Sequence, residues 1–121
     1  MTERRARYKT GRQSSRKCEA FGVVLDWHAE RDRYLELRAM QERGEITALE
    51  PHPKYILQPA FVMDNGEKVR AITYTPDFEY IENGSLVVED VKSEVTKTSL
   101  FRVKQKMFWF IFPDFELRII E

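Results

Sequence analysis

The dipeptide Asn83-Gly84 constrains the fold more than any other feature, because an Asn-Gly pair between strand-like segments is the strongest short-range signal of a β-hairpin. We expect strands at 77–82 and 85–92, joined by a two-residue turn. In that register Asp77 faces Asp90. Two aspartates that lie opposite one another on one face of a sheet repel each other. The hairpin therefore needs a partner that neutralises them.

The remaining hydrophobic pattern predicts an α/β domain, with a mixed β-sheet flanked by helices in the order helix, three or four strands, helix, strand. The strand at 85–92 is apolar on both faces as far as Glu89, so it should be central in the sheet. Before the hairpin we expect a short strand at 21–25 and then a helix from the N-cap Asp26 to about Arg43, which ends at Gly44. An extended or irregular segment at 45–60 should follow, and then strands at 60–63 and 69–75 joined by a turn at Asn65-Gly66. After the hairpin we expect a helix at 98–112, which ends at Pro113, and a strand at 115–120.

The charge is balanced over the whole chain but unevenly distributed. Residues 18–121 are long and apolar enough for one domain, whereas residues 1–17 form a basic, flexible N-terminal arm. Its seven basic residues stand against the single acid Glu3, and they are Arg4, Arg5, Arg7, Lys9, Arg12, Arg16 and Lys17. An arm of this kind can hold a polyanion such as DNA near a site, or it can serve as a solubilising tail.

The sequence also argues against secretion and membrane insertion. Cys18 is the only cysteine, so no intrachain disulfide can form, which suits a reducing cytoplasm. No segment approaches the roughly 20 apolar residues of a membrane span, and no apolar signal-peptide core follows the basic arm. We expect a cytoplasmic protein with no membrane partner.

Glu30 interrupts the apolar face of the first predicted helix. Trp27, Tyr34, Leu37 and Met40 recur at helical spacing, and Glu30 takes the remaining position in that stripe. A buried glutamate is costly unless something pairs with it. The structural alternative is a salt bridge from Glu30 to Arg33 or to a lysine of the sheet.

Glu30, Asp77 and Asp90 together form a candidate metal site. Lys92 lies two residues beyond Asp90 and should point to the same face. A salt-bridge network with Lys92 is one reading, but a single lysine cannot balance three carboxylates, whereas a divalent cation can. Oxygen ligands without a nearby histidine or thiolate favour Mg²⁺, or Mn²⁺ as its substitute. Three carboxylates, a hard metal and a lysine suit the hydrolysis of phosphodiester bonds.

The sequence at these positions resembles the PD-(D/E)XK nuclease superfamily. The motifs that carry the resemblance occur in order over residues 19–121, and they are D-W-H-A-E at 26–30, G-E-I at 44–46, I-T-Y-T-P-D-F at 72–78 and V-V-E-D-V-K at 87–92. Together they look like a group of small phage proteins with a restriction-endonuclease-like core. They are similar in style to phage endonuclease I and archaeal Holliday-junction resolvases, which are dimers that act on branched DNA.

The resemblance implies an endonuclease in which Asp77, Asp90 and the main-chain carbonyl of Val91 bind one or two metal ions, completed by Glu30. Lys92 would be the catalytic lysine. Further phosphate contacts would come from Gln58 and from Lys104 or Lys106. The family has Glu more often than Asp at position 90, but the adjacent Glu89 should point to the opposite face of the strand. A phage-encoded enzyme of this kind would act in the host cytoplasm.

Other nuclease classes fit the sequence less well. HNH enzymes need several histidines, whereas this chain has only His28 and His52, and the GIY-YIG motif is missing. A ribonuclease-H-like site has no dedicated lysine after its second acid. The alternative from another class is a non-catalytic DNA-binding or assembly protein on a degenerate nuclease fold, but converging carboxylates would repel its phosphates. RNA as a substrate stays open.

The segment Phe108–Phe112 is apolar on every side of the second predicted helix. A helix of that kind is buried against two neighbours, and in a domain of this size the second neighbour can be another subunit. We therefore expect a homodimer, which also suits the cutting of two strands.

Overall fold

The computed structural model describes residues 18–25, 27–93 and 95–121. The predicted basic arm at 1–17 lies outside the described residues, and so does Asp26, but the predicted N-cap is wrong by one residue because Trp27 is the N-cap of the first helix. Within the described ranges, no helix is long and apolar enough to cross a membrane.

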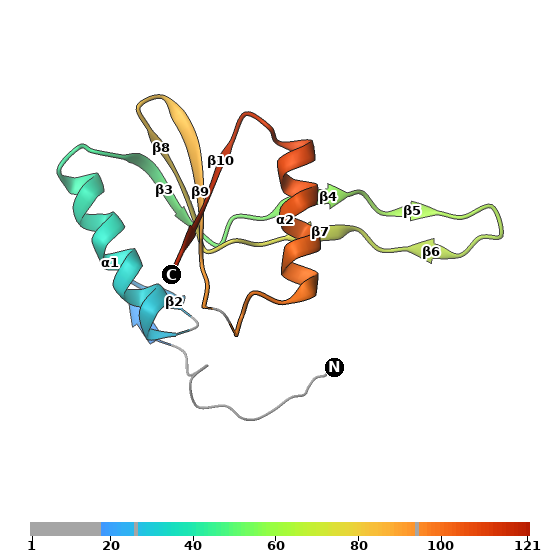
Figure 1. The fold of residues 1–121 in the computed structure, drawn as a ribbon, viewed down its shortest axis with the longest axis horizontal. Helices are drawn as coiled ribbons and strands as arrows, with labels where there is room; N and C mark the ends of the chain where they lie inside the picture. Colours follow the sequence, from blue (N-terminus) through green and yellow to red (C-terminus); the bar gives the residue numbers. More distant parts are fainter. Residues whose placement is uncertain (1–17, 26, 94) are drawn as a thin grey trace.

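A four-stranded mixed sheet forms the centre of the molecule, in the order β10-β9-β8-β3 (Figure 1). β9 (Ser85–Val91) pairs antiparallel with β8 (Phe78–Glu82) and parallel with β10 (Glu116–Ile120). β3 (Thr47–Pro51) is the edge strand on the other side of β8. The predicted central position of the strand at 85–92 is confirmed, as is the mixed α/β class.

The predicted hairpin turn at Asn83-Gly84 is present. Both residues have positive φ angles, 52° and 81°. These angles are typical of the type I′ turn that joins two strands tightly. The pairing of Phe78 with Glu89 is in the predicted register. Phe78 is the last paired residue on this side of the ladder, so the adjacent Asp77 lies just outside it. The Asp77 N–H still donates to the Glu89 carbonyl at 3.0 Å.

Two helices cover the two faces of the sheet, which gives three layers (Figure 1). Helix α1 (His28–Glu42) buries Tyr34 and Leu37 as the periodicity predicted, and Gly44 follows it with a φ of 81°. Helix α2 (Ser99–Ile111) begins at the N-cap Thr98, whose hydroxyl accepts a hydrogen bond from the Phe101 N–H. Pro113 follows its C-cap, because proline cannot continue a helix.

Two apolar cores lie on opposite sides of the sheet. The core under α1 contains Tyr34, stacked on Phe78 with ring centroids 5.6 Å apart. The core under α2 contains Phe108, which contacts Tyr74 and Tyr55 edge to face. β9 serves both cores because its alternate residues Val87 and Val88 point to opposite faces.

The segment between β3 and β8 forms one long, interrupted hairpin. β4 (Tyr55–Gln58) pairs with β7 (Ile72–Tyr74), and β5 (Phe61–Val62) pairs with β6 (Lys68–Val69). The predicted turn at Asn65-Gly66 closes this hairpin, since the Met63 N–H donates to the Glu67 carbonyl at 2.8 Å. Beyond β4 and β7 the ribbon extends away from the body as a projection (Figure 1), which we call the β-finger (residues 59–71).

The structure differs from the sequence expectation at three places. Residues 45–60, expected to be extended or irregular, supply both the edge strand β3 and β4. The predicted strands at 60–63 and 69–75 lie in the β-finger and its base rather than in the central sheet. The single short strand expected at 21–25 is a hairpin of β1 (Cys18–Ala20) and β2 (Val23–Leu25).

Candidate functional site

The candidate site lies where the long hairpin bends, between the β3/β8 pair and the β4/β7 pair. The register is the same on both sides of the bend, as the pairs Pro51↔Phe78 and Tyr55↔Tyr74 show. His52 and Asp77 are therefore cross-strand neighbours, and the His52 N–H donates to the Asp77 carbonyl at 2.8 Å. Three prolines at positions 51, 53 and 76 interrupt the ladder here, because proline has no N–H to donate.

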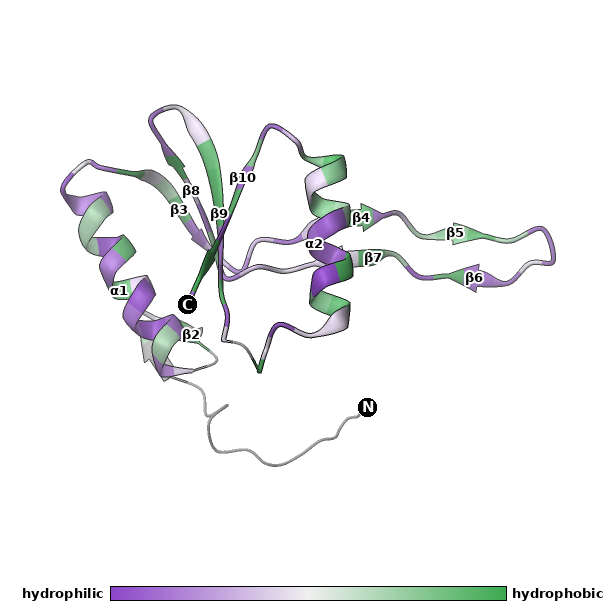
Figure 2. Ribbon diagram, viewed as in Figure 1, coloured by the Kyte–Doolittle hydropathy of each residue, from purple (hydrophilic) through white to green (hydrophobic). Residues whose placement is uncertain are grey.

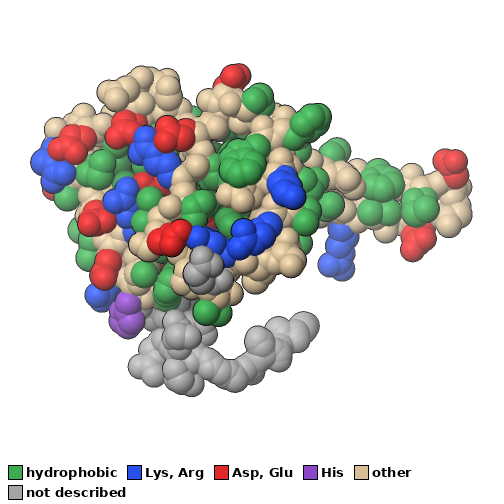
Figure 3. All heavy atoms as spheres, viewed as in Figure 1, with side chains coloured by type: hydrophobic (Ala, Val, Ile, Leu, Met, Phe, Trp, Pro, Cys, Tyr) green, Lys and Arg blue, Asp and Glu red, His purple; other side chains and the backbone are tan. Residues whose placement is uncertain are grey.

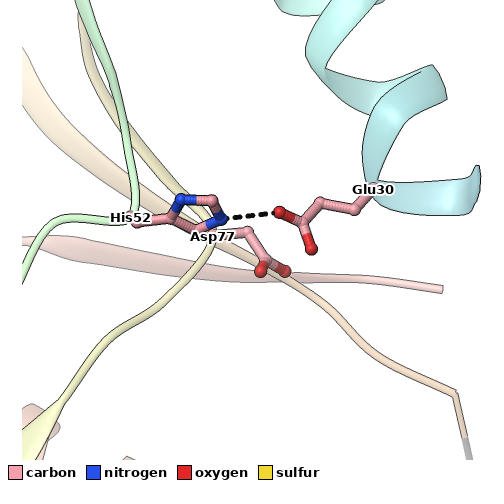
Figure 4. Close-up of side chains that lie close together, drawn as sticks. All are labelled: Glu30, His52 and Asp77. Carbon is pink, nitrogen blue, oxygen red and sulfur yellow. Dashed lines mark hydrogen bonds and ion pairs between the residues drawn. The ribbon is translucent and has the colours of Figure 1, made fainter. Parts of the chain in front are cut away.

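Glu30 of α1 reaches this bend and meets His52 and Asp77 (Figure 4). The Glu30 side chain is only 1% exposed, and its Oε2 lies 2.8 Å from His52 Nε2. Potential ligand atoms of Glu30, His52 and Asp77 all lie within 4.8 Å of one another. The cluster thus combines two carboxylates and an imidazole.

The presence of His52 corrects the sequence analysis, which assumed that no histidine lies near the acids. His52 has a φ of 51°, in the left-handed region that few residues other than glycine adopt. Such backbone strain is often concentrated at functional sites. The suggested salt bridge between Glu30 and Arg33 is also wrong, because Arg33 binds Glu89 instead.

Asp77 and Asp90 lie close together, Asp90 buried and Asp77 half-buried. Asp77 Oδ2 accepts a hydrogen bond from the Val91 N–H at 2.6 Å, and Asp90 Oδ2 accepts one from the Tyr74 hydroxyl at 2.5 Å. Burial, followed by the negative charge of Glu30, raises the pKa of Asp77 to about 6. Burial, with the charge of Asp77 adding to it, raises the pKa of Asp90 to about 7. Without a cation, the two groups disfavour full ionisation near neutral pH.

Lys92 lies on the same side as Asp90, as predicted. Its Nζ is 3.7 Å from Asp90 Oδ1 and 4.8 Å from the centre of the Phe101 ring. A distance of 3.7 Å is too long for a hydrogen bond, so Lys92 only partly compensates Asp90. Its ammonium group is held by the aromatic ring and can still approach a ligand.

An open pocket of about 320 Å³ adjoins this pair. Lys104 of α2 lines it together with Asp90 and Lys92, and so do the hydroxyl-bearing residues Thr73, Thr75 and Thr98. Ammonium and hydroxyl groups of this kind are suited to phosphate oxygens. A second pocket of about 560 Å³ lies on the α1 side, and Lys92 lines both. The site is therefore accessible from two sides of Lys92.

The structure separates the other predicted contact residues. Lys106 lines a different hollow beside Met107 and Phe110, away from the pocket that contains Lys104. Gln58 lies in β4, opposite Ile72, near the base of the β-finger. The Val91 N–H is bonded to Asp77, while the role predicted for its carbonyl stays a prediction. The basic residues Arg4 to Lys17 lie outside the described residues.

Glu89, the neighbouring acid on β9, has a different environment. It faces α1, where Arg33 Nε and Nη2 donate to its two oxygens at 2.8 and 2.6 Å. The Tyr80 hydroxyl donates to it as well. Glu89 therefore points away from Lys92, as strand alternation predicted, and its charge is matched by a guanidinium in the two-point geometry that suits a carboxylate.

Residues 10–121 match the model of a family described as a protein of unknown function, DUF1064. The chain belongs to the DUF1064 family. No curated protein matches this DUF1064 chain. The family description assigns no activity, so the function has to be argued from the site itself.

Sequence reasoning missed two residues of the DUF1064 site, His52 and Tyr74. His52 lies 22 positions from Glu30 and reaches it only through the register of the long hairpin. The one local signal was the alternation Pro51-His52-Pro53, which marks an interrupted edge strand. Tyr74 lies in the motif at 72–78, where its hydroxyl could have been matched to the buried Asp90.

Proposed function

We propose that this DUF1064 chain is a metal-dependent endodeoxyribonuclease with a restriction-endonuclease-like core, acting on branched or recombining DNA. One observation carries the proposal. Asp77 and Asp90 are crowded and water-poor, with pKa values of about 6 and 7, beside Lys92 and an open, lysine-lined pocket. Strongly perturbed carboxyl groups that line a cleft are typical of functional sites.

The donor set fits a divalent cation. Glu30, His52 and Asp77 offer ligand atoms within 4.8 Å of one another, and Asp90 lies beside Asp77. A dication would offset the burial and the mutual repulsion that raise the pKa values of Asp77 and Asp90. Carboxylates accept Mg²⁺, whereas an imidazole shifts the preference toward transition metals. We therefore propose Mn²⁺ as the more tightly bound ion and Mg²⁺ as the abundant alternative.

The surrounding residues have roles that suit phosphodiester hydrolysis. A bound cation would supply polarisation of the phosphate and a lowered pKa for a water molecule. Lys92, held beside Asp90, would orient the attacking water and stabilise the negative charge that develops on the phosphate. Lys104 and the threonines of the adjoining pocket would hold a neighbouring phosphate. Tyr74 fixes one oxygen of Asp90, which leaves Oδ1 facing Lys92.

The order of elements adds support. α1 supplies Glu30, the β8–β9 hairpin supplies Asp77, Asp90 and Lys92, and α2 with β10 completes the unit. The PD-(D/E)XK core has this helix, strands, helix, strand order. The same acids argue against a protein that only binds DNA, since buried carboxylates next to a phosphate pocket weaken binding unless a cation joins them.

The experiment is a cleavage assay on labelled four-way junction, flap, duplex and single-stranded DNA and on a matched single-stranded RNA, each with Mg²⁺, Mn²⁺ or EDTA. We expect cleavage of branched DNA in both metals and none in EDTA. Asp90→Asn and Lys92→Ala should each reduce the rate by about 1,000-fold, the size typical for loss of a key charge-stabilising group. Asp114→Asn, an exposed aspartate after α2, is the matched control and should cleave normally.

Each outcome has a definite meaning. Cleavage in EDTA, or full activity in Asp90→Asn, would contradict the metal-dependent site. Tight DNA binding without cleavage in any metal would favour the non-catalytic DNA-binding protein. Preferential cleavage of RNA would keep the site and change the substrate class.

A further inference from the structure

A large apolar surface lies on α2 and on the hairpin that includes the β-finger. Figure 3 shows apolar side chains gathered over α2 and along the projection. Among the described residues, nine of the thirteen exposed large apolar side chains belong to these two regions. They are Ile56, Phe61, Val62, Met63, Leu100, Val103, Trp109, Phe110 and Ile111. Exposed apolar surface of this extent marks an interaction site.

The β-finger makes little contact with its own chain. Neither of the two cores includes Phe61, Val62 or Met63, and these side chains are 47%, 63% and 44% exposed. β5 and β6 pair only with each other. An isolated two-stranded hairpin is marginally stable in water, so packing against another surface would stabilise it. Figure 2 shows that the residues of β5, on this projection, are hydrophobic.

The outer face of α2 presents a complementary surface. Phe110 is 87% exposed, and it borders a hollow of about 430 Å³ together with Leu57, Met107 and Ile111. This hollow is large enough for the side chain of a phenylalanine or methionine. The helix of 13 residues is about 20 Å long. The seven residues 59–65, from the base of the β-finger to its tip, extend over about 23 Å, so one finger can cover the whole helix.

The tip of the β-finger and α2 carry opposite charges, whereas Lys68 and Arg70 lie on the returning strand, nearer the base of the finger. α2 carries Arg102, Lys104 and Lys106 and no acidic residue. The tip of the β-finger carries Asp64 and Glu67, both exposed. In Figure 3 the acidic side chains of the tip lie at the far end of the projection, away from the basic side chains over the body. The acidic tip of the β-finger can therefore meet the basic residues of α2 on another molecule rather than on its own.

We propose that two copies of this chain form a symmetric dimer, in which the β-finger of each copy lies along α2 of the other. The contact is isologous, because the same finger and the same helix are used twice, so the assembly closes as a dimer. Phe61 and Met63, which alternate onto one face of the finger, cover Phe110 and the adjacent hollow, and Asp64 and Glu67 approach Lys106. The proposed dimer requires neither metal nor DNA, so it can be tested independently of the proposed nuclease activity.

The test is the mass of the full chain in solution, measured by sedimentation and light scattering without metal or DNA over a wide range of concentration. We expect twice the chain mass of 14.4 kDa at micromolar concentration. Phe110→Ser and the double variant Phe61→Ser/Met63→Ser should each raise the dissociation constant at least 100-fold. Leu35→Ser is the matched control, since Leu35 is an exposed apolar residue of α1 and should leave the dimer intact.

A charge exchange tests the orientation of the contact. Lys106→Glu should weaken the dimer about tenfold, and Asp64→Lys in the same chain should restore it. Circular dichroism of each variant shows whether the fold is retained. A monomer at all concentrations, a dimer that survives both serine variants, or a dimer that only Leu35→Ser disrupts would overturn the proposal. Loss of the dimer in Phe110→Ser but not in the finger variant would overturn the finger contact.

Discussion

Glu89 and Asp90 are adjacent on β9 and both nearly inaccessible to water, yet the groups that surround the two carboxylates differ. Glu89 faces α1, where Arg33 and Tyr80 donate hydrogen bonds to both of its oxygens. Asp90 faces α2, where its nearest cation, Lys92, stays 3.7 Å away. Asp90 also has Asp77 as a neighbour, which raises its pKa further. One acid is compensated within the fold, and the other is left with excess negative charge.

The difference separates a structural carboxylate from a functional one. A buried ion pair with good geometry needs nothing further, whereas a buried acid that shares its site with other acids stores unfavourable electrostatic energy. Such a group persists in a sequence when a ligand supplies the missing charge, because functional sites commonly sacrifice stability. In this account, the pair Glu89–Arg33 holds α1 on the sheet, and Asp90 belongs to the proposed metal site.

The largest expected effect on stability is at the compensated acid. Glu89→Gln leaves the partly buried guanidinium of Arg33 without its carboxylate, so we expect unfolding to become easier by about 3 kcal/mol. Urea unfolding at pH 7.5 measures this free energy. Glu116→Gln is the matched control, because Glu116 is an exposed partner of Arg118 and should cost less than about 0.5 kcal/mol. Equal costs for the two variants would contradict a structural role for Glu89.

The next effect concerns the imidazole of the proposed metal site. His52→Ala should weaken Mn²⁺ binding by about 10- to 100-fold and reduce the preference for Mn²⁺ over Mg²⁺, because carboxylates alone favour the harder ion. Isothermal titration calorimetry measures both affinities. His28→Ala, at the exposed start of α1, is the control and should leave both affinities unchanged. Unchanged binding in His52→Ala would remove the imidazole from the ligand set.

The burial of Asp90, which Lys92 compensates only in part, should make the free energy of unfolding depend on pH. The pKa of Asp90 is about 7 in the folded chain, well above that of an aspartate in an unfolded chain, which is about 4. Its ionisation is thus easier in the unfolded state, and the metal-free protein should lose stability as the pH rises from about 4 to 7. Asp90→Asn removes this loss, so it should be about 2 kcal/mol more stable than the wild type at pH 8, with the difference shrinking toward pH 5. A pH-independent difference would contradict the assigned origin.

The smallest effect distinguishes two lysines of α2. Lys104 shares the pocket of Asp90 and Lys92, whereas Lys106 lines another hollow. Lys104→Ala should weaken DNA binding about tenfold and reduce the salt dependence by about one phosphate contact. Lys106→Ala should change the DNA affinity of a single protomer less than twofold, as measured by fluorescence anisotropy in several salt concentrations. The reverse ranking would mean that the pocket beside Asp90 does not hold a phosphate.

The parts of the site that sequence predicted depend on short-range geometry. The turn at Asn83-Gly84 fixes which residues of β8 and β9 face each other, and strand alternation then assigns Glu89 and Asp90 to opposite faces. Helical periodicity likewise indicated that Glu30 is buried. These inferences needed only the repeat of a strand or a helix.

The parts that sequence missed depend on long-range pairing. β3 contains a register shift and a residue with a φ of 56°, Ala48, so its alternation is broken and it did not resemble a strand. His52 lies just beyond this strand, and its approach to Glu30 follows from pairing with a segment 25 residues later along the chain. The hairpin turn at Asn65-Gly66 was evident, but nothing local indicated that its strands leave the central sheet as the β-finger.

The most direct test of the account is the effect of Mn²⁺ on thermal unfolding at pH 8, in the wild type and in Asp90→Asn. A cation that binds only the folded chain stabilises it by an amount set by its concentration and affinity, about 2.7 kcal/mol at 100 times the dissociation constant. We expect Mn²⁺ to raise the Tm of the wild type by several degrees and to leave the Tm of Asp90→Asn nearly unchanged. No rise in the wild type, or an equal rise in both proteins, would contradict the claim that Lys92 compensates Asp90 only in part and that a metal ion supplies the remaining charge.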